Sequence, residues 1–217
     1  MIGRYSLWEV YYNQSNIILE YIAYWWYNHC MIFPNIIGIA GYARTGKDTF
    51  GSILIKELNE IGLSAKKLSL AFELKSDLDS FLTDKFGISA FSEDPKEKNF
   101  IRPLLICYGT DLMRKKDPEY WIKKIQKTID LNNNSGIISV VCDIRFLNEA
   151  SWLKNSGGIL AHLKRAGINP ADRNENENEN ALREVSDFPV NWESFTEDYI
   201  NKCRPTIKKF INDVQAH

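Results

Sequence analysis

The segment from Ile36 to Thr49 constrains the fold of this chain more than any other part of the sequence. It reads IIGIAGYARTGKDT, an apolar and mostly β-branched run followed by a glycine-framed loop, after which a helical pattern begins. The spacing Gly41-x4-Gly46-Lys47 is that of a P-loop, in which successive backbone N–H groups wrap a polyphosphate. The segment therefore predicts a buried strand, a phosphate-binding turn and a helix, in that order. A strand–turn–helix connection that binds nothing is the alternative.

Each residue type in this loop has a predicted task. Gly41 and Gly46 allow tight turns and a close approach of the backbone to phosphate. Lys47 is expected to reach the β- and γ-phosphates, and the N-terminus of the following helix adds positive potential. Asp48 stands where a P-loop usually carries Ser or Thr, and Thr49 follows it. Both are candidates for holding Mg²⁺, because hard cations take oxygen ligands.

Beyond the loop, strand patterns and helix patterns alternate along the chain. Such alternation indicates a three-layer α/β fold of the P-loop NTPase type, with a central, mostly parallel sheet flanked by helices. Ligands then bind beyond the carboxyl ends of the strands. The predicted strands are 36–40, 65–72, 137–142, 159–163 and 188–192, and the predicted helices are 49–61, 74–82, 101–113, 120–131, 146–153 and 199–214.

Two features of the C-terminal third depart from this regular pattern. Residues 166–187 contain an alternating Asn-Glu tract at 174–180, a low-complexity composition that is unable to bury a core. We predict a mobile, lid-like loop there. Pro205 is predicted to kink or divide the final helix, because proline removes a backbone donor.

Residues 1–34 form a predicted aromatic-rich extension, which leaves 35–217 as the P-loop domain. Glu20 and Pro34 interrupt the apolar run, so no membrane span is predicted, and no cleavage site suggests a signal peptide. Three interpretations stay open. The extension is a helix packed on the domain, an upstream segment with Met31 as the working start, or a helix for a membrane surface or a partner.

Composition narrows the class of protein. With 217 residues, 44% hydrophobic and 25% charged, the chain is long enough for one globular domain with or without an appendage. A net charge of −1 argues against a general nucleic-acid binder. The four cysteines have no paired spacing and the three histidines form no cluster, which predicts reduced thiols, no zinc site and a cytoplasmic location, in the host cytoplasm if the protein is viral.

A second polar motif, Asp143-Ile144-Arg145, directly follows the strand predicted at 137–142. Because the carboxyl ends of parallel strands meet at one edge of the sheet, we expect this motif to face the same cleft as the glycine loop. Asp143 is a candidate for an acid near the metal. The alternative is a structural cap, with Arg145 as a plain ion-pair partner.

Arginines are the expected ligands of an acceptor phosphate, because they bind oxyanions in a bidentate manner. Arg102, Arg114 and Arg145 are the candidates. Arg165 borders the lid-like segment, so closure of a lid would bring it onto ATP. Trp121 is a candidate for stacking on a nucleobase, with packing in the core as the alternative.

Several segments together resemble the bacteriophage-type deoxynucleoside monophosphate kinase family, within the P-loop nucleoside monophosphate kinase group. That family tends to carry Gly-Lys-Asp-Thr, which accounts for Asp48. One departure is the absence of the His-x-Ser-Glu segment that often follows the fourth strand, since the nearest match is Glu184-Val185-Ser186-Asp187. The segments that carry the resemblance are Arg44-Thr45-Gly46-Lys47-Asp48-Thr49, Ala71-Phe72-Glu73-Leu74-Lys75, Gly109-Thr110-Asp111-Leu112-Met113-Arg114 with Trp121, and Asp143-Ile144-Arg145-Phe146-Leu147-Asn148-Glu149.

The resemblance implies transfer of the ATP γ-phosphoryl to a deoxynucleoside monophosphate (dNMP), with Mg²⁺, to give the diphosphate and ADP. It implies that the loop and Lys47 bind ATP, that Arg102, Arg114 and Arg145 lie near the acceptor, and that Asp143 lies near the metal or acceptor. With the residue-based expectations added, the predicted sites are Gly41, Arg44, Thr45, Gly46, Lys47, Asp48, Thr49 and Arg165 for ATP, Lys47, Asp143 and Arg145 for catalysis, Arg102, Arg114, Arg145 and Trp121 for the acceptor, and Asp48, Thr49 and Asp143 for the metal.

Three other functions stay open at this point. One is a kinase of another small phosphorylated acceptor, such as phosphomevalonate. Another is a nucleotide-binding module without catalysis, anchored through residues 1–30. The third is a simple P-loop hydrolase. The sequence also leaves open which bases are accepted and the oligomeric state, a homodimer included.

Overall fold

The computed structural model describes residues 33–170, 173–193 and 199–217. By its contacts the chain divides into one unit of Met1–Phe33 with Gln215–His217 and another of Pro34–Val214, and the second unit holds the sheet and its surrounding helices. The interpretations of residues 1–34, including a start at Met31, fall on residues 1–32, which lie outside the described part. The predicted domain division stays a prediction.

Five parallel strands form one sheet, with β1 in the middle. The spatial order is β2-β3-β1-β4-β5, and because every pair is parallel, strands that are consecutive in the chain are joined by crossover connections. All five residues of β1 are buried, which is why its sequence is a continuous apolar run instead of an alternating one. The strands are β1 (Ile36–Ala40), β2 (Ala65–Leu68), β3 (Ile138–Val141), β4 (Ile159–Arg165) and β5 (Phe188–Trp192).

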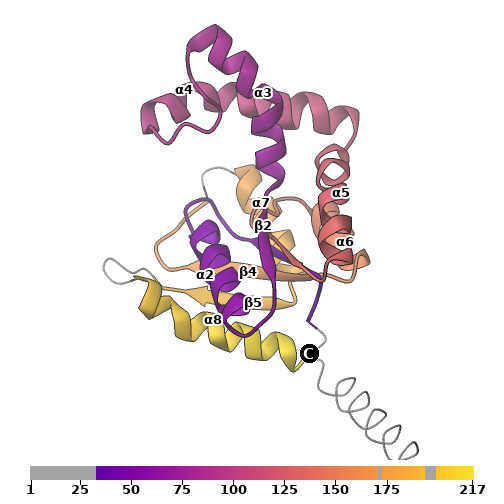
Figure 1. Ribbon diagram of the computed structural model, residues 1–217. Helices are drawn as coiled ribbons and strands as arrows, with labels where there is room; N and C mark the ends of the chain where they lie inside the picture. Colours follow the sequence, from indigo (N-terminus) through magenta and orange to yellow (C-terminus); the bar gives the residue numbers. More distant parts are fainter. Residues whose placement is uncertain (1–32, 171–172, 194–198) are drawn as a thin grey trace, which may run out of the picture. The chain divides into compact units, whose positions relative to one another are not determined.

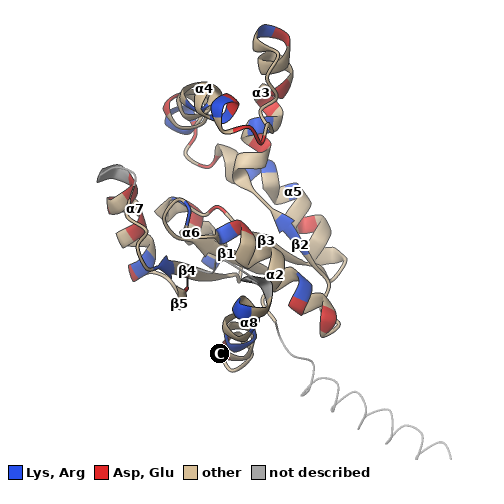
Figure 2. Ribbon diagram, turned by 90° about the vertical axis from the view of Figure 1, so that its left-hand side faces the viewer, with Lys and Arg blue, Asp and Glu red and all other residues tan. Residues whose placement is uncertain are grey.

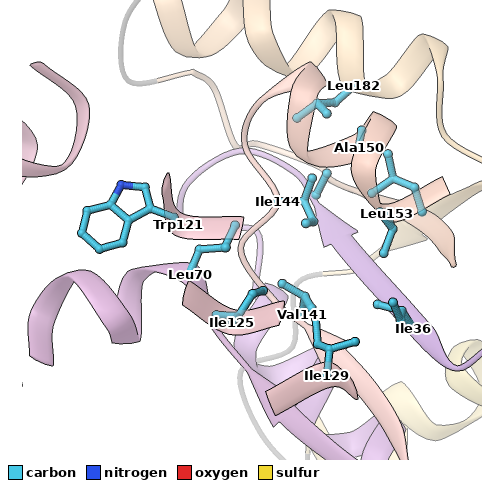
Figure 3. Packing of buried hydrophobic residues seen from close by; sticks show 12 residues of the cluster. Ile36, Leu70, Trp121, Ile125, Ile129, Val141, Ile144, Ala150, Leu153 and Leu182 are labelled. Atoms are coloured by element: carbon cyan, nitrogen blue, oxygen red, sulfur yellow. The ribbon is translucent and has the colours of Figure 1, made fainter. Parts of the chain in front are cut away.

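Helices cover both faces of the sheet, which confirms the predicted three-layer α/β fold. On one face lie α2 (Lys47–Glu60) and α8 (Tyr199–Gln215), where the Phe50 ring meets the rings of Trp192 and Phe210 with centroids 5.3 and 5.5 Å apart. On the other face, α5 (Tyr120–Asn134) and α6 (Leu147–Asn155) pack against the strands. Figure 3 shows Ile129 and Leu153 of these helices in that core.

Three helical segments extend from the end of β2, away from the sheet (Figure 1). They are α3 (Leu70–Phe86), α4 (Pro95–Ile106) and the π-helix η1 (Cys107–Arg114). The strand predicted at 65–72 was too long, because Ser69 ends it and caps α3 by accepting the N–H of Phe72. Asp94 caps α4 in the same way, with Pro95 at the first helical position.

The mobile loop predicted for residues 166–187 is wrong for most of that segment, because Arg173–Glu184 form helix α7. In an alternating tract, residues four apart are of the same type. A helix therefore gathers Glu175 and Glu179 on one face and Asn176 and Asn180 on the next. Glu179 is buried against His162 of β4, and Leu182 enters the core (Figure 3). These contacts with the sheet and the core stabilise the helix, and the composition of the tract does not predict them.

Pro205 does not divide the final helix, since α8 runs from Tyr199 to Gln215 with the proline inside it. Buried residues on both sides of Pro205, namely Cys203 and Ile207, hold the helix on the sheet. Their burial offsets the backbone hydrogen bond that proline removes. Within the described residues, no helix combines the length and the apolar character that crossing a bilayer requires.

The packing of the core predicts that two leucines contribute very differently to the free energy of unfolding. Leu153 is fully buried between α6 and the sheet, whereas Leu131 on α5 is 60% exposed. We expect Leu153→Ala to lower the free energy of unfolding by about 3 kcal/mol, because it deletes buried methyl groups and leaves a cavity. The matched change Leu131→Ala should have little effect. Urea denaturation followed by circular dichroism measures both, and equal losses in the two variants would contradict this core.

Candidate active site

The loop after β1 has the backbone geometry that its glycines predicted. Gly41 adopts a φ of +139°, and a Cβ there would lie 2.6 Å from the backbone oxygen of Leu163. Gly46 adopts a φ of +92°, and a Cβ there would lie 2.7 Å from Nε1 of Trp192. Both positions therefore exclude any larger residue without a rearrangement. The tightness of this loop, with β4 and β5 beneath it, depends on these two residues.

Lys47 is folded onto the loop that it follows. Its ammonium donates to the carbonyl of Gly41 and, at 2.9 Å, to that of Tyr42. Burial lowers the pKa of Lys47 from its usual 10.5, and the nearby carboxylates of Glu179 and Glu175 oppose that shift. The charge of Lys47 is thus poorly solvated, which favours its pairing with a polyanion.

One cavity of about 650 Å³ brings most of the predicted site residues together. It extends from the glycine loop to the segments beyond the sheet. Thr45 and Arg165 lie at the loop as well, since Thr45 donates through Oγ1 to the Tyr42 carbonyl at 2.8 Å and Arg165 donates to the Arg44 carbonyl at 3.4 Å. The predicted residues that line the cavity are Arg44, Gly46, Lys47, Asp48, Thr49, Arg102, Arg114, Trp121, Asp143 and Arg145. Their individual roles stay predictions.

Asp143 lines this cavity and also caps helix α3. Its Oδ1 accepts the N–H of Leu70 at 2.9 Å, and its Oδ2 accepts the N–H of Ala71 at 2.7 Å and the hydroxyl of Ser69 at 2.8 Å. The first N–H groups of a helix lack intrahelical acceptors, so this carboxylate satisfies them. These contacts match the alternative in which Asp143 is a structural cap, and the element that it caps is helix α3.

Glu149 is a buried residue of the site to which sequence reasoning assigned no role. Its Oε1 pairs with the guanidinium of Arg114, and its Oε2 accepts the N–H of Arg145 at 2.7 Å and of Phe146 at 3.1 Å. Arg114 also stacks on the Phe146 ring, 3.8 Å from its centroid. Burial raises the pKa of Glu149 to about 7, and Arg114 opposes that shift. A Glu three residues into a helix, as in a capping box, was the available signal.

The oxygen atoms beside the loop fit a magnesium ion held partly by substrate. The Asp48 carboxylate lies 2.5 Å from the Lys67 ammonium and is largely exposed, and Thr49 lines the cavity. Mg²⁺ usually keeps several waters and takes one or two protein ligands together with substrate phosphates. Asp143 already accepts three hydrogen bonds, so it fits a water-mediated role. Within the described part of the chain, no group of three or more His, Cys, Asp or Glu residues is arranged to hold a metal alone.

Trp121 and Arg102 differ in how much of the side chain is available to a ligand. Trp121 is 3% exposed, donates through Nε1 to the Gly109 carbonyl at 3.1 Å, and contacts the rings of Tyr108 and Tyr120 edge-on. These contacts correspond to the core-packing alternative, although part of Trp121 reaches the cavity wall. Arg102 lines the same cavity from α4 and is exposed.

A glycine loop after the central strand of a parallel sheet, with a lysine directly behind it, is the arrangement of a P-loop nucleotide-binding protein. A family model described as deoxynucleotide monophosphate kinase matches residues 82–203, more than half of the chain. The chain therefore belongs to the deoxynucleotide monophosphate kinase family. It is a nucleoside monophosphate kinase, that is, an ATP-dependent phosphotransferase.

Individual proteins are similar to this chain at sequence identities below 30%. A protein of Acanthamoeba polyphaga mimivirus that carries the same family's name is 28% identical over 173 residues, which cover 71% of this chain and 86% of that protein. The APS kinase of Mycobacterium tuberculosis is 12% identical with a TM-score of 0.42, covering 85% of this chain and 99% of its own. A gluconokinase from Sinorhizobium meliloti 1021 is 14% identical, with the same coverage and TM-score.

Glu149 predicts a pH dependence of stability. Its pKa is about 7 in the folded chain against a usual 4.5, so the folded state binds more protons between those values. The stability that the protonated group contributes is fully present below the unfolded pKa and is lost as the pH rises through the folded one. We expect the free energy of unfolding to fall by about 2 kcal/mol more in the unmodified protein than in Glu149→Gln between roughly pH 5 and pH 8. Urea denaturation across that range measures the difference, and parallel pH profiles would exclude this titration.

Proposed function

We propose that this protein transfers the γ-phosphoryl group of ATP to a deoxynucleoside 5′-monophosphate, giving the deoxynucleoside diphosphate and ADP. The observation that carries the proposal is the single cavity that holds Lys47 and the glycine loop together with Arg102 and Arg145. Phosphoryl transfer requires two phosphate groups in line within one cleft, and this cavity offers cations to both. The family and the mimivirus relative support a deoxynucleotide as the acceptor.

The donor end of the reaction lies at the loop. The backbone N–H groups from Gly41 to Thr49 bind the ATP phosphates, and Lys47 exchanges the Gly41 and Tyr42 carbonyls for phosphate oxygens. Asp48 and Thr49 would hold Mg²⁺, which when bound neutralises the charge developing on the phosphates. Arg44 within the loop and Arg165 beside it add positive charge around the phosphates.

The acceptor end lies between α3, α4 and η1. Arg102 and Arg145 bind the dNMP phosphate, because guanidinium groups match phosphate oxygens in geometry and charge. Arg114 is held by Glu149 and forms part of the wall. The base packs among apolar residues of the same lining, which include Leu70, Leu74, Ala90, Ile101, Leu105, Ile106, Trp121 and Phe146.

We further infer that the reaction takes place in the cytoplasm. The described cysteines, Cys107, Cys142 and Cys203, are all free thiols. Free thiols are the usual state of cysteines in a reducing compartment.

An assay of ADP release tests the proposed reaction directly. The full chain is supplied with ATP and Mg²⁺ and with each of the four dNMPs in turn, while ribonucleoside monophosphates and phosphomevalonate serve as comparators. We expect ADP release to depend on a dNMP. Release that needs no acceptor would indicate a hydrolase, and the absence of release with every dNMP would refute the proposal.

The role of Lys47 predicts a large loss of activity. Lys47→Ala removes the charge next to the transferring phosphoryl group, so we expect kcat to fall by roughly a thousandfold. Lys56→Ala is the control, because Lys56 is an exposed lysine on the same helix. Its kcat should stay unchanged within about twofold. Near-normal turnover by Lys47→Ala would remove Lys47 from the mechanism.

Arg102 predicts a selective loss of acceptor binding. We expect Arg102→Ala to raise the KM for dNMP by about tenfold or more, because a charged hydrogen-bonding partner of the phosphate is lost. The KM for ATP should change little. Lys96→Ala, which removes an exposed charge from the same helix α4, is the matched control. Initial-rate kinetics with each substrate varied in turn separate the two constants, and an equal rise in both would assign Arg102 a different role.

A further inference from the structure

Helix α7 donates a carboxylate to the glycine loop. The backbone N–H of Ala43 donates to Oε1 of Glu175 at 2.8 Å, although the two residues are 132 positions apart in the chain. Next to this contact, the hydroxyl of Tyr42 donates to Oδ1 of Asn176 at 2.7 Å. Glu175 also lines the cavity that holds Lys47. A carboxylate of the protein is therefore bound to a loop N–H that is predicted to bind phosphate.

The position of Glu175 is set by the rest of α7. One turn further along the same helix face, Glu179 is buried and lies 3.0 Å from Nε2 of His162 on β4. Leu182 is fully buried in the core beside Ala150 of α6 (Figure 3). Figure 2 marks the positions of the acidic and basic residues along the α7 ribbon in red and blue. These anchors make the contact between Glu175 and Ala43 part of the packed fold, so that Glu175 is presented to the loop.

A carboxylate and a phosphate oxygen compete for the same type of donor. The N–H groups of a P-loop form a concave site for anions. An N–H has a single hydrogen, so an N–H that donates to a carboxylate cannot at the same time donate a well-aligned hydrogen bond to a phosphate oxygen. The charge of Glu175 also acts on Lys47, since it raises the pKa of that lysine against the effect of burial. Glu175 thus offers the loop and the lysine the two interactions that a nucleotide would offer.

We propose that Glu175 is a built-in competitor of the nucleotide phosphates, and that α7 releases the Ala43 amide when ATP binds fully. The inference rests on the proposed nucleotide site. The apparent affinity for ATP is then the intrinsic affinity multiplied by the fraction of molecules in which the amide is available. The alternating Asn-Glu tract acquires a function in this way, because its Glu face supplies the competing anion and its Asn face holds Tyr42.

The test compares two variants that lose the same charge from the same helix. Glu175→Gln keeps the shape of the side chain and removes the anion at the loop. Glu184→Gln removes an exposed anion at the other end of α7, about 13 Å away along the helix axis. Isothermal titration calorimetry of the full chain measures the Kd of ATP and of inorganic tripolyphosphate, a probe that has the phosphates but no base.

We expect Glu175→Gln to lower the Kd of both probes by roughly fivefold, and Glu184→Gln to leave them within about twofold of the unmodified protein. Equal or weaker binding by Glu175→Gln, in a protein that does bind ATP, would overturn the competitor and leave the proposed function standing. Failure of the unmodified protein and both variants to bind either probe would overturn both ideas.

A second measurement needs no variant. Hydrogen exchange of the full chain, followed by mass spectrometry, reports the protection of residues 173–184 with and without ATP. If α7 releases the loop on binding, exchange should rise at saturating ATP in the N-terminal half of the helix, which carries Glu175 and Asn176, while the half anchored by Leu182 and the strands of the sheet stay protected. Unchanged or slower exchange of that N-terminal half in the ATP-bound protein would contradict the release.

Discussion

The hydrogen bonds from the start of α3 to the carboxylate of Asp143 connect the two sides of the cleft. Leu70 and Ala71 donate their N–H groups to this one side chain at the end of β3, which fixes the direction in which α3 leaves the sheet. Helix α4 and η1 follow α3 in the chain, so the acceptor end of the cavity depends on the same bonds. Asp143 therefore caps α3 and lines the cavity at the same time, while its role in catalysis stays a prediction.

Two acids of the cleft accept hydrogen bonds from backbone N–H groups of the protein. Glu149 holds Arg114 and the backbone at Arg145, while Glu175 holds the amide of Ala43. A buried carboxylate without such partners would be costly. Arg114 of η1 is paired with Glu149, whereas Arg102 of α4 lines the same cavity and is exposed. The arrangement separates an arginine that is paired with a buried acid from an exposed one, which is the arginine proposed to bind the acceptor phosphate.

Local patterns predicted much of the fold and part of the site. The apolar run at Ile36–Ala40, the glycine spacing and the helix behind it are all consequences of short-range sequence, and all three were confirmed. The meeting of Asp143 and Arg145 with the loop at one cavity followed from the rule that parallel strands end at the same edge. The Asn-Glu tract was mispredicted because its composition carries no apolar period, whereas its helix is held by long-range partners such as His162. The division of the final helix predicted at Pro205 was wrong for the same reason, since the burial of Cys203 and Ile207 is a property of the packed sheet.

The amino-acid sequence by itself determined the order of strands and helices, the phosphate-binding form of the loop and the kind of chemistry that a lysine behind two glycines can support. These depend on backbone sterics and on periodicity within a few residues, which a sequence displays directly. Only the tertiary structure decided which carboxylate meets which amide: Asp143 at α3, Glu149 at Arg145, and Glu175 at Ala43. Such bonds join segments that are far apart in the chain, or residues that a turn brings together. Their existence depends on distances of a few tenths of an ångström that packing alone sets.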